Sequence, residues 1–141
     1  MLANLLNRID SLFQIFTAPL LLISRLLIAY FFLPAGIEKI QNYSGTASMM
    51  ESTGIPGILL PLVILLEIGG ALLVAAGFVT RLTCLALALF AIVANQMYNS
   101  DATTQVHQML YTAEFVTVAG MTALMAVGPG RWSLDALRGG R

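Results

Sequence analysis

The sequence predicts an all-α integral membrane protein, a bundle of four membrane-spanning helices preceded by an N-terminal amphipathic helix in the membrane interface. Hydrophobic residues make up 58% of the 141-residue chain and charged residues only 10%, with a mean hydropathy of +0.86. Average soluble domains carry about 25% charged residues, so a soluble fold of this size would lack polar surface. Four apolar stretches also approach the roughly 20 residues that a helix needs to cross a bilayer.

Residues 1–17 form the predicted interfacial helix. Polar side chains separate its apolar ones, which recur at helical spacing at Leu2, Leu5, Leu6, Ile9, Leu12, Phe13 and Phe16. A secretory signal peptide would instead contain a continuous apolar core. Pro19 suits the first turn of the helix that follows.

The bundle itself is predicted for residues 18–130. Its four spans are expected at about residues 18–37, 59–78, 82–98 and 108–127. A polar loop at 41–57, with room for a short helix, joins the first two spans. A short turn at Val79–Arg81 joins the second and third, and the turn-rich stretch NSDATTQ joins the last two.

The fourth span ends at Gly128–Gly130, because glycine and proline together stop a helix. Residues 131–141 then form a cytoplasmic tail. An even number of spans places both termini on one side, and that side holds five basic residues against one: Arg8, Arg81, Arg131, Arg138 and Arg141, against Lys39. The positive-inside rule therefore predicts a multi-pass protein of a bacterial inner membrane with both termini in the cytoplasm.

The composition also limits the chemistry of the chain. A formal net charge of zero indicates no nucleic-acid partner. With one cysteine, Cys84, and one histidine, His107, the chain can form neither an internal disulfide nor a bis-histidine haem site. We therefore expect no metal site and no cofactor held by this chain alone, and Cys84 is expected to be a packing residue.

Three ionisable residues fall inside the predicted spans, namely Arg25, Glu67 and Glu114. Charged side chains at such depths cost several kcal/mol and nearly always face the bundle interior or water. Measured from the cytoplasmic edge at the helical rise, Arg25 lies roughly 10 Å deep, Glu67 roughly 16 Å, and Asn95 and Glu114 roughly 20 Å. We therefore expect one polar intramembrane cluster of Arg25, Glu67, Asn95 and Glu114.

Within this cluster, Arg25 is expected to pair with Glu67. A purely structural ion pair that fixes helix register is the alternative. Glu114 is expected either as a protonated acid bonded to Asn95 or in a water-filled vestibule. Arg81 is expected to anchor the cytoplasmic interface, and Glu38–Lys39 to mark the outer boundary of the first span.

Four strings, RLLIAYFFLPAGIEKI, YSGTASMMESTGIP, LEIGGALLVAAGFVTRLT and GPGRWSLD, resemble the DoxX/DoxD-like membrane proteins over about residues 20–136. The positions that match the family pattern are Arg25, Gly36, Lys39, Glu67, Gly69, Gly70, Gly77, Thr80, Arg81, Gly128–Gly130, Ser133 and Asp135. The chain departs from it at Ala113–Glu114, where relatives often carry Lys-Asn. It also departs at Asn95, Gln96 and Tyr98, where relatives often carry histidines.

The resemblance implies a four-helix inner-membrane protein, and some family members are described as subunits of quinone-linked or thiol-linked oxidoreductase complexes. The expected function is a membrane subunit of such a complex, whose polar cluster binds a quinone head group or relays protons. A redox partner subunit would supply the electron transfer, and no catalytic residue is identified in this chain. The alternative is a non-catalytic scaffold or a small-molecule permeation protein, whose pore would need a homo-oligomer. A third option, a protein acting at the lipid interface, depends on residues 2–16.

Overall fold

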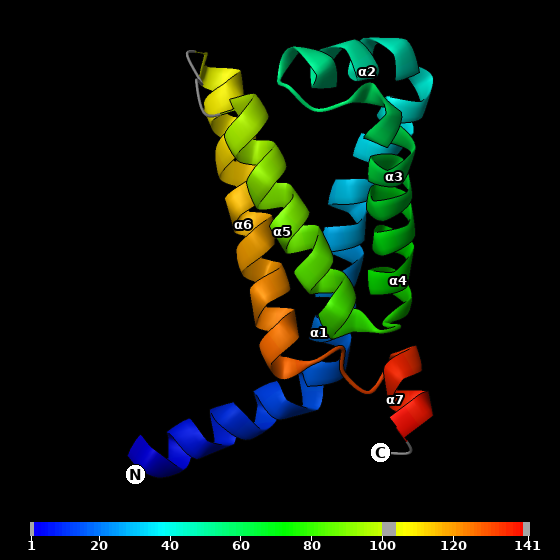
Figure 1. The fold of residues 1–141 in the computed structure, drawn as a ribbon. Helices are drawn as coiled ribbons and strands as arrows, with labels where there is room; N and C mark the ends of the chain where they lie inside the picture. The colour runs from blue at the N-terminus through cyan, green and yellow to red at the C-terminus, as the bar shows by residue number, and fades with distance from the viewer. Residues whose placement is uncertain (1, 100–103, 140–141) are drawn as a thin grey trace.

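A computed structural model describes residues 2–99 and 104–139, and every regular element within these ranges is helical (Figure 1). The four predicted spans are confirmed. Four stretches of this part of the chain are helical, long enough and apolar enough to cross a membrane: Asn4–Gln41, Gly57–Ala76, Thr80–Tyr98 and Gln105–Val127. The fold is therefore the predicted membrane bundle.

The first helix, α1 (Leu2–Gln41), joins the predicted interfacial helix and the first span in one continuous element of 40 residues. At about 1.5 Å per residue it is about 60 Å long, roughly twice the thickness of a bilayer core. Pro19 and Pro34 lie inside it, and prolines inside helices produce bends. Figure 1 shows that its N-terminal part runs away from the bundle before the helix turns into the span.

The second span is assembled from consecutive short helices. After η1 (Gly57–Leu59) come three that follow one another without a break: α3 (Leu60–Ile64), η2 (Leu65–Gly69) and α4 (Gly70–Ala76). The middle one, η2, is a π-helix and carries Glu67. Single π turns inside α-helices occur frequently at functional sites, so this segment is a candidate functional site.

Two short helices distinguish the ends of the bundle. The polar loop predicted at residues 41–57 contains α2 (Tyr43–Ser52), which lies across one end (Figure 1). The predicted tail contains α7 (Leu134–Gly139), at the opposite end together with both termini. We refer to these as the α2 end and the terminus end. Arg141 and residues 100–103 of the predicted last loop lie outside the described residues.

The remaining helices, α5 (Thr80–Asn99) and α6 (Gln105–Val127), pack along each other, and α5 also packs on α4. Buried apolar side chains from four helices form the core, which includes Ile28, Phe32, Val74, Cys84, Leu87, Met121 and Leu124. By their positions in these helices, most of them lie in the half near the terminus end. The predicted packing role of Cys84 is confirmed, because its side chain is fully buried in this core.

In the half near the α2 end, a glycine brings α1 and η2 together. A Cβ atom built on Gly36 would lie 2.5 Å from Ile68 Cγ1 and 3.4 Å from Glu67 Cβ. Real Cβ atoms do not approach a carbon so closely, so α1 and η2 can keep this spacing only with glycine here. This contact sets how far a side chain from α1 must reach to meet Glu67.

We predict that Gly36→Ala lowers the free energy of unfolding in detergent by about 1–3 kcal/mol, because the added methyl group overpacks the contact with Ile68. Gly69→Ala is the matched control, since its Cβ would meet only Leu65 Cδ1 at an ordinary 3.8 Å. Thermal unfolding of both variants tests this. Equal melting temperatures for the two would show that the close contact is not needed.

Candidate functional site

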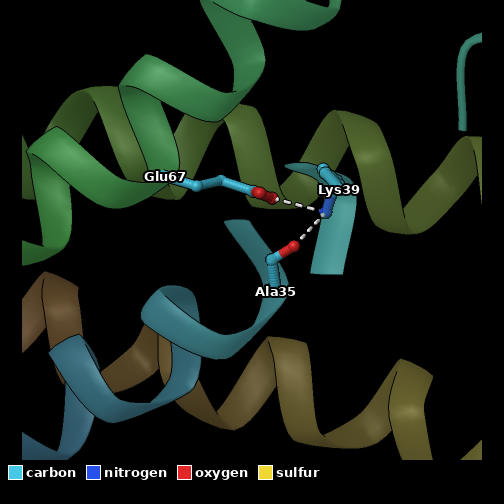
Figure 2. A network of polar contacts seen from close by, with 3 residues as sticks. All are labelled: Ala35, Lys39 and Glu67. Atoms are coloured by element: carbon cyan, nitrogen blue, oxygen red, sulfur yellow. Dashed lines mark hydrogen bonds and ion pairs between the residues drawn. The ribbon is translucent and has the colours of Figure 1, made fainter. Parts of the chain in front are cut away.

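The buried acid of the second span is ion-paired with a base from the first helix. Lys39 Nζ lies 3.0 Å from Glu67 Oε1 and also donates to the carbonyl oxygen of Ala35 at 3.4 Å (Figure 2). The Glu67 side chain is 5% exposed and that of Lys39 26% exposed. Glu67 therefore faces a basic neighbour on another helix, as expected, but this neighbour is Lys39 and not Arg25.

A second acid on α6 belongs to the same group of charges. Glu114 is partly buried and lies within electrostatic range of both Lys39 and Glu67. In the part of the chain that the structure describes, Oε2 of Glu67 and Oε2 of Glu114 are buried and accept no hydrogen bond. We call Lys39, Glu67 and Glu114 the Lys39 cluster. Its one ammonium is ion-paired with Glu67, and each of the two acids has an oxygen available to a further donor.

Asn95, also predicted for the cluster, lies on α5 and connects this helix to α6. Its buried side chain donates from Nδ2 to the carbonyl oxygen of Tyr111 at 3.0 Å. Gln96 Nε2 lies 3.3 Å from the Tyr111 hydroxyl and strengthens the same contact. Tyr111 precedes Glu114 by three residues on α6, so Asn95 holds α6 about one turn from the second acid.

Arg25 does not belong to the cluster, which corrects the expectation above. Its guanidinium donates from Nη1 to the carbonyl oxygen of Ala75 at 3.0 Å, and from Nη2 to that of Trp132. Ala75 lies in the last turn of α4, where carbonyl groups have no partner within the helix and the helix dipole favours a cation. Lys39 lies fourteen residues away along α1, a separation of about 21 Å. These backbone acceptors, and not Glu67, bind the two Nη groups of Arg25, while its buried Nε has no hydrogen-bond partner among the described residues.

Arg25 is part of a polar lock at the terminus end, which also includes Gly77, Val79, Thr80 and Asp135. The Asp135 carboxylate accepts hydrogen bonds from the backbone N–H groups of Val79 at 2.7 Å and Thr80 at 2.9 Å, and from Thr80 Oγ1 at 2.9 Å. It therefore caps the N-terminus of α5 from a distant part of the chain. Gly77 ends α4 with φ +69°, and any Cβ there would collide with the Arg25 guanidinium.

Asp135 also holds a strained residue in place. Val79 has φ +48°, in the left-handed region that β-branched residues avoid. Burial alone would raise the pKa of Asp135, but hydrogen bonds from Thr80 and Val79 and the nearby charge of Arg138 together hold that pKa below its usual range. The ionised carboxylate is therefore the form that keeps this turn folded.

The remaining predicted residues lie outside the Lys39 cluster. Gly70 lies against the side chain of Leu87, Arg81 is exposed with its guanidinium 3.5 Å from the carbonyl oxygen of Ala126, and Ser133 donates to that of Gly130 at 2.6 Å. Within residues 2–99 and 104–139, no group of three or more His, Cys, Asp or Glu could hold a metal ion.

Sequence reasoning also missed the role of Lys39, which was expected only to mark, together with Glu38, the outer boundary of the first span. A usable signal was present in the sequence. Lys39 follows Gly36 by three residues and shares its helix face, and it is the only lysine in the chain. Glycine allows helices to pack closely, so the face of the first span that carries Gly36 is suited to contact another helix. Lys39 lies at the end of that face.

Four apolar spans, a buried charge cluster near one end and a polar lock at the other define an integral membrane helix bundle. A family model described as DoxX matches residues 20–99. The chain belongs to the DoxX family. The Escherichia coli K12 inner membrane protein YqjF is 39% identical over 116 residues, covering 82% of this chain and 89% of YqjF. The inner membrane protein YphA of the same strain is 29% identical over 123 residues, covering 82% and 88% respectively. No solved structure matches the chain.

We predict that Lys39→Met lowers the free energy of unfolding by about 3 kcal/mol, because it leaves buried acids without their cation. Lys39→Met combined with Glu67→Leu should recover most of this loss, because an apolar pair leaves no buried charge uncompensated. Unfolding in detergent micelles measures both, with Glu38→Gln as an exposed control on the adjacent residue. A double variant no more stable than Lys39→Met would contradict the pairing.

We predict that Asp135 stabilises the protein in a pH-dependent way. Because its native pKa is lowered, its contribution is complete above the pKa of an unfolded aspartate, about 3.9, and is lost as the pH falls through the lower native value. The melting temperature of the wild type should therefore exceed that of Asp135→Asn at neutral pH. This difference in melting temperature should disappear at acidic pH. Asp10→Asn, at an exposed position on α1, is the control. A gap that stays constant with pH would show that ionised Asp135 does not hold the turn.

Proposed function

We propose that this protein is a membrane subunit of a quinone-linked oxidoreductase complex, in which the Lys39 cluster binds the quinone head group or relays its protons. The observation that carries the proposal is the pairing of Lys39 with Glu67 within electrostatic range of Glu114, with two buried carboxylate oxygens that accept no hydrogen bond among the described residues. Such charges inside a span are expensive and are retained mainly where they act.

The donors and acceptors of the cluster match those of a quinone head group. A quinone presents carbonyl oxygens, which can accept a hydrogen bond from the Lys39 ammonium. A quinol presents hydroxyl groups, which can donate to the open oxygens of Glu67 and Glu114. Oxidation of a quinol to a quinone releases two electrons and two protons. The carboxylates are placed to receive protons, and the electrons pass to a redox partner.

The redox partner is part of the proposal because this chain has few groups for electron transfer. Its one cysteine, Cys84, is buried in the apolar core, and its one histidine, His107, is exposed at the start of α6. Neither a thiol pair nor a set of metal ligands is available from these two residues. A second subunit therefore supplies the electron acceptor or donor.

The location of the cluster in the cell follows from the spans and from the relatives. Two relatives are named inner membrane proteins, and we propose the same membrane for this chain. The arginine-rich terminus end then faces the cytoplasm, by the positive-inside rule. This orientation supports a Lys39 cluster in the periplasmic half of the bilayer.

We predict that quinone co-purifies with the protein from membranes solubilised by an amphipathic polymer. Glu67→Gln and Lys39→Met should each lower the quinone recovered per chain about tenfold, because a hydrogen bond to a charged group contributes roughly 1.5–3 kcal/mol. Glu51→Gln on α2 is the matched control, since this glutamate is exposed and lies outside the cluster. Extraction and mass spectrometry measure the quinone.

Two results together would overturn the proposal. One is the absence of quinone from the wild-type preparation, and the other is an unchanged rate of quinol oxidation in membranes that contain Glu67→Gln. That combination would favour the alternative of a scaffold or permeation protein, in which the ion pair only fixes how α1 and η2 pack.

A further inference from the structure

The terminus end carries large apolar side chains that the bundle does not cover. In the N-terminal part of α1 they are between 40% and 71% exposed: Leu2, Leu5, Leu6, Ile9, Leu12, Phe13, Ile15 and Phe16. In the C-terminal segment Trp132 is 58%, Leu134 44% and Leu137 78% exposed. Two segments from opposite ends of the chain therefore leave apolar surface open at the same end of the molecule (Figure 1).

We infer that residues 2–17 and 131–139 form an interfacial collar that lies in the headgroup layer of the bilayer, with lipid as the partner that covers its apolar side chains. The inference is independent of the quinone site. It accounts for surface that would otherwise face water, and apolar patches of this extent mark contact with a membrane or another molecule.

The continuity of α1 supports lipid as that partner. The helix runs without a break from Leu2 to Gln41 and is about twice as long as the bilayer core is thick. Because Lys39 near its other end reaches the buried Glu67, the excess length lies at the N-terminal end. Figure 1 shows that this part turns away from the bundle axis at the terminus end. A helix that leaves a span in this direction remains close to the membrane surface.

The polar lock sets the depth of the C-terminal segment. Arg25 binds the carbonyl oxygen of Trp132, and Asp135 binds the backbone at the first residues of α5. Trp132 is therefore held level with the end of α4 and the start of α5, where these spans meet the headgroups. Tryptophan is enriched at this level because its ring is apolar and its N–H is polar.

The charges around Trp132 suit lipid phosphate. Arg81, Arg131 and Arg138 are exposed at the same end, whereas the carboxylate of Asp135 is occupied by its hydrogen bonds to α5. Arg138 also stacks over the ring of Phe78, 5.1 Å from its centroid. In contrast, the N-terminal part of α1 carries Arg8 and Asp10, whose charges cancel. The C-terminal segment therefore favours anionic lipids, and the N-terminal segment binds through its apolar face.

Trp132 is the only tryptophan in the chain, so its emission in the unmodified protein tests the collar. The protein is reconstituted into vesicles of phosphatidylcholine and phosphatidylglycerol, with bromine on the acyl chain either close to the headgroup or close to the chain end. We predict that Trp132 emission is lost with bromine near the headgroup and largely kept with bromine near the chain end. When only one of the two lipids carries bromine, the loss should be larger with brominated phosphatidylglycerol than with brominated phosphatidylcholine, because the exposed arginines enrich anionic lipid around Trp132.

A second protein extends the test to the N-terminal segment. Phe13→Trp in a Trp132→Phe background places the only tryptophan on α1, and we predict the same depth profile without dependence on anionic lipid. Emission of Trp132 that is quenched by aqueous iodide and not by brominated lipid would overturn the collar. So would emission that resists both quenchers and changes with the protein-to-lipid ratio, because a second copy would then cover the tryptophan.

Discussion

A charge inside the bilayer must find its partner within the bundle, and this requirement shapes the half of the protein near α2. Lys39 and Glu67 meet at 3.0 Å, and either side chain alone would cost several kcal/mol at this depth. The pairing depends on Gly36, which allows α1 and η2 to approach, and on the π turn that carries Glu67. A π turn holds one residue more than an α turn, so it changes which side chains of the span face α1.

The opposite end uses charges differently. There Arg25 donates to one carbonyl group at the end of α4 and to that of Trp132, and Asp135 accepts from backbone N–H groups at the start of α5. Both side chains therefore act on backbone groups at helix ends. Most of the apolar core lies in the same half of the bundle. The half near the terminus end is thus held by packing and capping. The Lys39 cluster lies in the other half, which contains fewer of the buried core residues, and two of its carboxylate oxygens accept no hydrogen bond from the described chain.

Hydropathy was sufficient to predict the four spans, because lipid imposes length and composition on a spanning helix. Gly128–Gly130 was sufficient to predict the end of the last span. The inward direction of Glu67 followed from the cost of a charge in lipid. Its partner did not follow, because depths counted along each helix from an assumed membrane edge placed Glu67 near Arg25. In the structure Glu67 lies level with Gly36, where a Cβ would be 3.4 Å from Glu67 Cβ, and Lys39 is one turn further along the same helix. Arg25 was assigned wrongly because carbonyl groups at helix ends compete for a guanidinium and leave no pattern in the sequence.

Solid-state NMR on the protein in lipid tests the central pairing most directly. Because Lys39 is the only lysine, labelling lysine with nitrogen-15 gives a single ammonium signal, and carbon-13 on glutamate carboxyl groups supplies the possible partners. We predict dipolar coupling between this ammonium and a carboxyl carbon that disappears in Glu67→Gln and persists in Glu38→Gln. Coupling that survives in Glu67→Gln, or that is absent from the wild type, would contradict it.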